Sequence, residues 1–423
     1  MSASRSINRG VIGVIAVYFS VMAIFFSLLS PCHAAEDMRP VSTFEGGKLY
    51  KNGPVDVVVL SGTFRQMGRQ YGGLLSGKIK EFYKELHAEF IKSGSFTEKQ
   101  IADYIVKPAS LNYNKRYSEF IRGVSETAGL DEGKIIITNE NILMTLFSRK
   151  LKGGNVTSCT SIATWGSYTK DGTVITARDF DFPSFYRELF KKYGNFVIMK
   201  PVDGSNVISG IGYAGSINFS DIMNGKGIDT QFNNGAGSEG IIIYSNRGNV
   251  LADAVNLLFD CDTIAAYEVR MRAIRANIPT IMMGADKRSA RYFENGTSAL
   301  RVRSASQNGI IGAANQFLDP EWGIIPVPSP AIWYSEQRRE NMMKAVESQK
   351  GNIDETVMMS LMDRKLYDKN GIVSDGFAVF EKQPHDDEVT VYQIVTSPQR
   401  LVWWLRVPTF TGWLKFDLDK LVK

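Results

Sequence analysis

The chain has 423 residues, enough for one large domain or two modest ones. Hydrophobic residues make up 44% and charged residues 22%, which excludes an intrinsically disordered chain. Lys and Arg outnumber Asp and Glu by 49 to 44, and this net charge of +5 is too small to indicate a nucleic-acid binder. The chain has only three cysteines, too few for a disulfide scaffold, and only three histidines, too few for a histidine-rich metal site. We therefore expect no metal and no bound cofactor.

The amino terminus has the pattern of a signal peptide. Arg5 and Arg9 precede an apolar stretch at residues 11–29, and small residues around Ala34 suit cleavage there. The pattern predicts a signal peptide at residues 1–34 and export to the periplasm or the outside. About 20 apolar residues also span a bilayer, so an uncleaved membrane anchor is the alternative. Lipid modification of Cys32 is disfavoured, because Pro31 precedes it.

Residues 35–158 form a mainly helical segment in this interpretation. A strand at 55–60 is followed by helical periodicity at 64–91, 101–111, 117–128 and 134–147. Gly68 and Gly72 lie four residues apart in the first of these helices. Such a pair lets another backbone approach closely.

From residue 159 the pattern changes to strands. The alternation at 159–168, the Lys-Asp-Gly-Thr turn at 170–173 and the strand at 174–178 predict a hairpin. Further strands are expected at 196–200, 207–213, 227–232, 310–314, 389–396 and 401–407, with helices at 249–259, 263–275 and 335–349. The sequence thus predicts an α+β unit over residues 159–423, divided from the helical segment near Ser158.

Cys159 is the candidate nucleophile, since it opens the first strand of this hairpin. The antiparallel return places Arg178 and Asp181 near that strand start, where a cation and a carboxylate can orient and ionise a thiol. The alternatives are a buried structural cysteine and a surface Arg-Asp pair of little energetic weight. For Cys261, at a helix junction, we expect only core packing.

Five motifs in order resemble those of the amino-terminal-nucleophile hydrolases, specifically the penicillin acyltransferase and choloylglycine hydrolase family. They are the Gly-spaced run at 62–72, Cys-Thr-Ser at 159–161 with Arg-Asp-Phe-Asp at 178–181, Met-Asn-Gly-Lys-Gly-Ile at 223–228, Ala-Asn-Gln at 314–316 and Ser-Glu-Gln-Arg at 335–338. The likeness extends over most of the chain that follows residue 34. Three positions depart from the family pattern: Gly225 stands for an acidic residue, Ala314 for Thr and Gln316 for His, which puts substrate contacts near them in doubt.

The resemblance implies a four-layer αββα sandwich with a helical amino-terminal prosegment. It also implies that the precursor cuts itself between Ser158 and Cys159, and that residues 35–158 and 159–423 stay associated as two subunits. The new α-amine then acts as base; with a pKa of about 7.7 to 8.0 it needs no histidine. Arg178 and Asp181 would lie beside the new amino terminus.

The same resemblance places the oxyanion donors among the asparagines. Asn315 is one candidate, and we favour Asn233 over Asn234 for the other, although turn capping is an ordinary role for all of them. Arg338 would bind a carboxylate or hold Asp181, or would be solvated on an exposed helix.

The expected activity is hydrolysis of a linear amide in a small N-acyl compound through a thioester. Because coenzyme A thioesters are cytoplasmic, we expect an exported enzyme to hydrolyse the amide, with acyl transfer as the alternative. The aromatic run at 322–333 is a candidate acyl pocket, with core packing as its other role. Two rivals are an exported binding protein that keeps the fold, and a peptidase that pairs Cys159 with His385, a residue in a polar loop.

Overall fold

The computed structural model describes residues 38–151, 159–239, 246–305, 309–325, 331–384 and 387–422. The predicted signal peptide or anchor, Ser158 and His385 lie outside these residues. So does part of the aromatic run at 322–333. No helix within the described ranges is long and apolar enough to cross a membrane.

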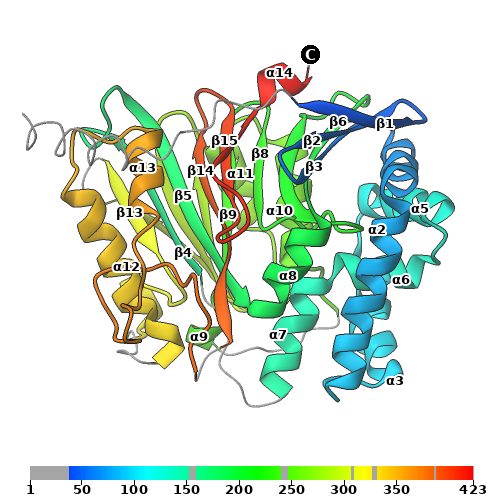
Figure 1. Cartoon of the computed structure of the whole chain (residues 1–423), viewed down its shortest axis with the longest axis horizontal. Coiled ribbons are helices and arrows are strands. Elements are labelled where there is room, and N and C mark those ends of the chain that lie inside the picture. Colours follow the sequence, from blue (N-terminus) through cyan, green and yellow to red (C-terminus); the bar gives the residue numbers. More distant parts are fainter. Residues whose placement is uncertain are drawn as a thin grey trace, which may run out of the picture.

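Two sheets form the centre of the molecule (Figure 1). The first has ten strands in the order β1-β2-β3-β6-β7-β8-β9-β10-β11-β12. Its strands are β1 Arg39–Phe44, β2 Gly47–Asn52, β3 Val55–Gly62, β6 Gly194–Pro201, β7 Ile208–Tyr213, β8 Asp221–Asn224, β9 Asp229–Asn234, β10 Thr280–Ala285, β11 Ala290–Asn295 and β12 Leu300–Ser304. The second has six strands in the order β13-β4-β5-β14-β15-β16. Its strands are β4 Cys159–Gly166, β5 Gly172–Pro183, β13 Ile310–Ala313, β14 Glu388–Ser397, β15 Val402–Arg406 and β16 Leu414–Asp417.

The two sheets stack face to face. Ala163 and Val174 of the six-stranded sheet share one buried apolar cluster with Ile281 and Met283 of the ten-stranded sheet. Helices α12 (Ala331–Glu347) and α13 (Glu355–Leu361) cover the outer face of the six-stranded sheet. Helix α10 (Val250–Asp260) packs on β8 of the other sheet, and α11 (Ile264–Met271) packs on α10. The predicted α+β αββα sandwich is therefore confirmed.

The amino-terminal segment contains the expected strand near 55–60 and, before it, two strands that the sequence analysis did not predict. Its strands β1, β2 and β3 form one edge of the ten-stranded sheet, and β3 runs parallel to β6 from Asp56 beside Asn195 to Gly62 beside Pro201. The helices that follow are α2 Phe64–Lys92, α3 Glu98–Ile101, a π-helical stretch Ala102–Val106, α4 Lys107–Asn112, α5 Lys115–Ala128, α6 Glu132–Asn139 and α7 Asn141–Leu151. The segment before residue 158 is thus built into the sheet of the segment after it.

The predicted glycine pair brings α2 and α5 into close contact. A Cβ on Gly68 would lie 2.2 Å from the backbone oxygen of Phe120, and one on Gly72 would lie 2.4 Å from Oγ1 of Thr127. Gly123 on α5 approaches α2 equally closely, because a Cβ added to it would lie 2.2 Å from the backbone oxygen of Arg65. The backbones therefore approach more closely than side chains allow.

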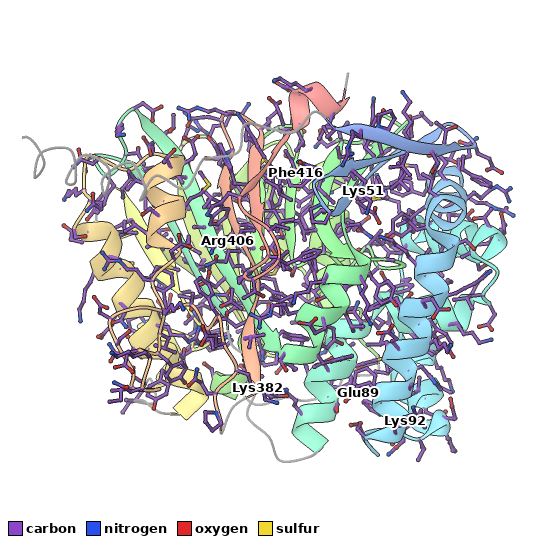
Figure 2. The ribbon with its side chains drawn as sticks, in the orientation of Figure 1. Lys51, Glu89, Lys92, Lys382, Arg406 and Phe416 are labelled. Atoms are coloured by element: carbon purple, nitrogen blue, oxygen red, sulfur yellow. The ribbon has the colours of Figure 1, made fainter. Side chains whose placement is uncertain are left out.

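The last strand of the chain, β16, lies close to the amino-terminal strand β2. Lys51 on β2 and Phe416 on β16 lie near each other in the upper middle of Figure 2. The side chain of Asn52 donates a hydrogen bond of 2.8 Å to the carbonyl of Lys415, and the Phe416 ring stacks on Phe196 at 4.4 Å between centroids. The remaining helices are short: α8 Ser184–Tyr193, α9 Ala236–Glu239, α14 Leu418–Val422 and a 3-10 turn Pro320–Trp322.

Candidate active site

The hairpin of β4 and β5 sets the position of Cys159. Its register pairs Cys159 with Phe180, Thr160 with Asp179 and Ser161 with Arg178. Because strand side chains alternate between faces, Arg178 and Phe180 share the face of Cys159, whereas Asp179 and Asp181 lie on the other face with Thr160. The return strand thus brings the side chain of Arg178 and the backbone of Asp181 next to the cysteine.

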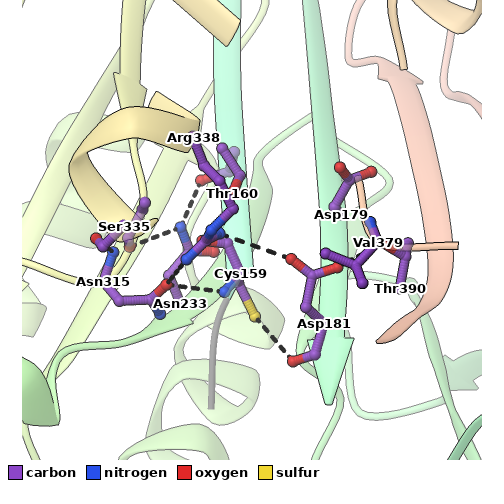
Figure 3. Close-up of polar contacts among 12 residues, drawn as sticks. Cys159, Thr160, Asp179, Asp181, Asn233, Asn315, Ser335, Arg338, Val379 and Thr390 are labelled. Atoms are coloured by element: carbon purple, nitrogen blue, oxygen red, sulfur yellow. Dashed lines mark hydrogen bonds and ion pairs between the residues drawn. The ribbon is translucent and has the colours of Figure 1, made fainter. Parts of the chain in front are cut away.

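Both reactive atoms of Cys159 have specific partners. The backbone nitrogen donates a hydrogen bond of 2.9 Å to Oδ1 of Asn315 (Figure 3). The sulfur lies 3.1 Å from Nη2 of Arg178 and 3.9 Å from the backbone oxygen of Asp181. Nucleophile and backbone nitrogen are therefore held within one cluster of polar groups.

Burial controls the ionisation of this thiol. Cys159 is 2% exposed, and burial raises its pKa to about 11, although the neighbouring Arg178 charge lowers it and Asp181 raises it further. Desolvation has a larger effect on this pKa than the Arg178 cation, which acts in the opposite direction.

Arg178 is fully buried and is held by carboxylate, amide and sulfur. Its Nη1 lies 2.5 Å from Oδ2 of Asp221, and its Nε donates to Oδ1 of Asn233 at 3.2 Å. The guanidinium also lies 4.9 Å from the centre of the Phe180 ring. Burial is the largest single influence and opposes its charge, but Asp221, Cys159 and Tyr392 together outweigh it, so the pKa of Arg178 is raised.

Asp181 faces Arg338 and Thr390 rather than the Cys159 nitrogen. Thr390 donates to its Oδ1 at 2.6 Å, and Nη1 of Arg338 lies 3.6 Å from its Oδ2. In the uncut chain the backbone nitrogen of Cys159 donates to Asn315. Burial raises the pKa of Asp181, against the lowering effect of Arg338, and burial together with Asp181 raises that of Asp179.

Arg338 is buried in the site, which excludes the solvated alternative. From α12 its Nη1 donates to the carbonyl oxygen of Cys159 at 2.9 Å and to the hydroxyl of Thr160, while its Nη2 donates to Oδ1 of Asn315 at 2.9 Å. Ser335, one helical turn earlier, accepts from the backbone nitrogen of Asn315 at 2.9 Å. The Ser-x-x-Arg motif thus fixes the strand start and the asparagine together.

The two neighbouring asparagines of β9 have different surroundings. Nδ2 of Asn233 donates to Oγ of Ser161 at 2.9 Å and to the carbonyl of Ala314 at 3.1 Å. Asn234 caps the nitrogen of Ala236 with its side chain and accepts from Nδ2 of Asn315 with its backbone oxygen at 3.0 Å. Asn233 is the one that contacts Arg178.

The departure at Gly225 lies away from this cluster. The turn between β8 and β9 contains Gly225, and Oδ1 of Asn224 closes that turn on the nitrogens of Lys226 and Ile228. Asn233 lies at the opposite end of β9, four residues beyond Asp229, or about 13 Å along a strand. The Met-Asn motif is therefore a turn former in this chain.

Other chemistry finds little support in the described residues. No group of three or more His, Cys, Asp or Glu there is placed to hold a metal ion. The side chain of His87 pairs with Glu98 on the helical segment, 3.0 Å away, and its ring faces Tyr83. Cys261 is buried, as its expected packing role requires.

The sequence did not indicate several residues that complete the site. Asp221, Ser220 and Tyr392 surround the Arg178 guanidinium, and Thr390 holds Asp181. All are fully or almost fully buried polar groups in strands, or beside one, far along the chain from Cys159. Asp221 lies two residues before Met223, the first residue of the Met-Asn motif, and this proximity was the one available signal.

No family model matches the sequence, and no curated protein sequence matches it. Among solved structures, a variant of the conjugated bile acid hydrolase of Clostridium perfringens is 13% identical, covering 62% of this chain and 93% of its own, with a TM-score of 0.42. The N-acylethanolamine-hydrolyzing acid amidase ortholog of Caenorhabditis elegans is 16% identical, covering 57% and 93%, with a TM-score of 0.39. Penicillin V acylase of Agrobacterium tumefaciens is 12% identical, covering 62% and 87%, with a TM-score of 0.38.

These structures are of the class that the five sequence motifs resemble, the amino-terminal-nucleophile hydrolases. The four-layer fold of this chain, with a cysteine at the start of an inner strand, fits that class. Because the TM-scores are below 0.5, the matches assign no residue role and no substrate to this chain.

Proposed function

We propose that this protein is an exported, self-processing cysteine hydrolase that cleaves a linear amide bond of a small N-acyl compound. The observation that carries the proposal is the placement of Cys159: its nitrogen is bound by Asn315 at 2.9 Å and its sulfur by Arg178 at 3.1 Å. A cysteine that opens a strand can present both its sulfur and a freed amine to one substrate. His87 is bound to Glu98 on the helical segment, and the freed amine would supply a base at Cys159 itself.

Processing would be the first reaction. The sulfur of Cys159 attacks the carbonyl carbon of residue 158, the peptide C–N bond breaks, and the nitrogen takes up the thiol proton. Water then hydrolyses the resulting thioester, which leaves a carboxylate on residue 158 and a free α-amine on Cys159. Arg338 bonds to the Cys159 carbonyl and would keep the strand start in place during both steps.

Turnover would use the same sulfur. The α-amine accepts the thiol proton, the thiolate attacks the substrate carbonyl, and the leaving amine receives that proton as the C–N bond breaks. Hydrolysis of the thioester by water releases the acid. Arg178 stabilises the thiolate, and Asn233, Asn234 and Asn315 are the candidate oxyanion donors. The reaction involves no cofactor.

Asp181 would act from the other face of the strand. In the uncut chain its Oδ2 faces Arg338 at 3.6 Å and has no hydrogen-bond partner among the described residues. A cation created at the nitrogen of Cys159 would give this buried carboxylate a second charged neighbour. We therefore propose that Asp181 favours the protonated form of the amine after it has taken the thiol proton.

Export favours hydrolysis over acyl transfer. The predicted signal at residues 1–34 would direct the protein away from coenzyme A thioesters, whether the signal is removed or stays as an anchor through residues 11–29. Expected substrates are N-acyl amino acids, acylated amines, bile-salt-like conjugates or β-lactam side chains.

The two products of the cut would stay together. Strand β3 of the first fragment is hydrogen bonded to β6 of the second over seven residue pairs. Arg116 of α5 also lies 2.8 Å from Asp260 of α10 and packs over the Phe259 ring at 5.5 Å. These contacts support a two-fragment enzyme rather than one that releases its prosegment.

The decisive test is the mass of the purified protein under denaturing conditions. We expect two fragments, the larger beginning at Cys159, for the natural chain and for Cys261→Ala, and one intact chain for Cys159→Ala. Two unchanged fragments in Cys159→Ala would contradict self-cleavage.

Activity is then measured as amine release from N-acyl amides of a fluorescent amine. A processed protein that releases amine only with an added acyl acceptor would be a transferase. An intact, inactive natural chain would point to a binding protein.

A further inference from the structure

The ion pair of Arg178 and Asp221 lies between the two sheets, on β5 and β8. Both side chains are 0% exposed and their nearest atoms are 2.5 Å apart. The same Oδ2 of Asp221 accepts from the Tyr392 hydroxyl at 2.5 Å and from the Ser220 hydroxyl at 3.0 Å. A carboxylate held by three donors, from β5, from β14 and from the residue before β8, has one orientation, and so does the guanidinium it binds.

The guanidinium divides its donors between this carboxylate and the nucleophile. Nη1 is directed to Asp221, Nη2 to the sulfur of Cys159, and Nε to the amide oxygen of Asn233. Because the guanidinium is planar, fixing Nη1 and Nε also fixes Nη2.

We propose that Asp221 is a positioning residue that acts through Arg178: it holds Nη2 beside the sulfur of Cys159 and limits how much positive charge the sulfur experiences. A free buried cation at 3.1 Å would strongly favour a thiolate, which is a good leaving group as well as a good nucleophile. Asp221 on the far side of the guanidinium offsets that charge, so that proton transfer to a base remains part of the reaction.

Other charged or titratable groups lie around this pair. Asp179 and Asp181 on β5, Tyr392 on β14 and Tyr292 on β11 interact electrostatically with Arg178 or with the sulfur. Asp229 on β9 interacts electrostatically with Asp221 and is bound by the hydroxyls of Thr176 and Thr396, each at 2.7 Å. Among the described residues, Asp221 is the carboxylate in ion-pair contact with Arg178, the group that touches the sulfur.

The inference rests on the proposed function, because it concerns the nucleophile of that reaction, but its test needs no turnover. The apparent pKa of Cys159 is measured from thiolate absorbance at 240 nm in the full-length protein. The spectrum of the matching Cys159→Ser variant is subtracted at each pH, which removes Cys32, Cys261 and the tyrosines. The titration is possible on cut or uncut protein, so a missing amidase activity would not affect it.

We expect Asp221→Asn to lower the apparent pKa of Cys159 by about one pH unit or more, because Arg178 is left uncompensated. Ser220→Ala removes hydrogen bonds to the same pair without removing charge, and we expect it to change that pKa by less than about 0.3. A purely structural role would predict no fall in Asp221→Asn, or a rise as the guanidinium moves away. Either result would overturn the inference.

Asp221→Asn leaves a buried cation and is the variant most at risk of not folding. Arg178→Gln/Asp221→Asn contains no unpaired charge and is compared with Arg178→Gln alone. If Asp221 acts through Arg178, the two have the same thiol pKa within about 0.3. A difference of more than about half a pH unit would show that Asp221 acts on the sulfur directly and would refute the inference.

Discussion

Two glycines of helix α2 should respond in opposite ways to the same substitution. Gly68 faces α5, where a Cβ would lie 2.2 Å from the backbone oxygen of Phe120 and 3.1 Å from Cα of Gly123. Gly77, nine residues later, has no atom within 4 Å of that position. We expect Gly68→Ala to destabilise the protein and Gly77→Ala to stabilise it.

The geometry sets the size of each effect. A carbon atom next to a backbone oxygen needs about 3 Å, so α2 and α5 must separate by roughly 0.8 Å at Gly68. Overpacking of this kind costs about 3 kcal/mol when backbone rather than a flexible side chain has to move. Alanine has a higher helix propensity than glycine, which stabilises either variant by about 1 kcal/mol. The free energy of unfolding should therefore fall by about 2 kcal/mol for Gly68→Ala and rise by about 1 kcal/mol for Gly77→Ala.

The free energies of unfolding are compared by urea titration with far-ultraviolet circular dichroism. The Cys159→Ala background keeps every sample as one chain, whatever the processing of the natural protein. Equal changes for the two variants, or a Gly68→Ala variant more stable than its parent, would refute the argument from helix contact.

Three further predictions concern the site and the interior. Burial raises the pKa of Asp229 to about 7, whereas the unfolded chain ionises this carboxyl near pH 4. The folded protein therefore loses stability as the pH rises from about 4 to about 7. In urea titrations, Asp229→Asn should raise the free energy of unfolding by about 2 to 3 kcal/mol more at pH 8 than at pH 5. If the α-amine of Cys159 is the base, kcat/KM should rise with pH through about 8 in the natural protein and equally in His87→Gln, and loss of that limb in His87→Gln would assign the base to histidine instead. Arg338→Lys keeps a charge near Asp181 but cannot form all three bonds of the planar group, so kcat should fall at least about tenfold with little change in melting temperature; an unchanged kcat would remove Arg338 from the site.

The hairpin that carries the nucleophile could be predicted because its signals are local. Alternating residues on both sides of a Lys-Asp-Gly turn define the strands, and the resulting register places Arg178 near Cys159. Strands β1 and β2 could not be predicted in this way. Their sequences, Arg-Pro-Val-Ser-Thr-Phe and Gly-Lys-Leu-Tyr-Lys-Asn, are short, and β1 is mostly exposed; they form strands because β3 provides a partner for β2, which in turn pairs with β1.

Some of the polar residues around Cys159 could also be predicted from the sequence, and others could not. Asn315 and Arg338 carry motifs, and the sequence indicated them, although burial of Arg338 on a helix of mixed composition was not foreseeable from periodicity. Asp221 and Thr390 belong to no motif that was recognised. They reach the site through the stacking of two sheets and the pairing of β5 with β14, which are long-range contacts without a local pattern.

The shared sheet of the two segments has a consequence for the lifetime of the protein. Strand pairing between β3 and β6 requires that the whole chain folds before any cut at Cys159. Once the cut is made, the linker no longer keeps the two pieces at a high effective concentration, so an unfolded molecule would have to reassemble from two separate chains. The cut protein would therefore not refold readily after unfolding, and its lifetime would depend on the height of its unfolding barrier. The cut protein would then persist for as long as that barrier delays its first unfolding event.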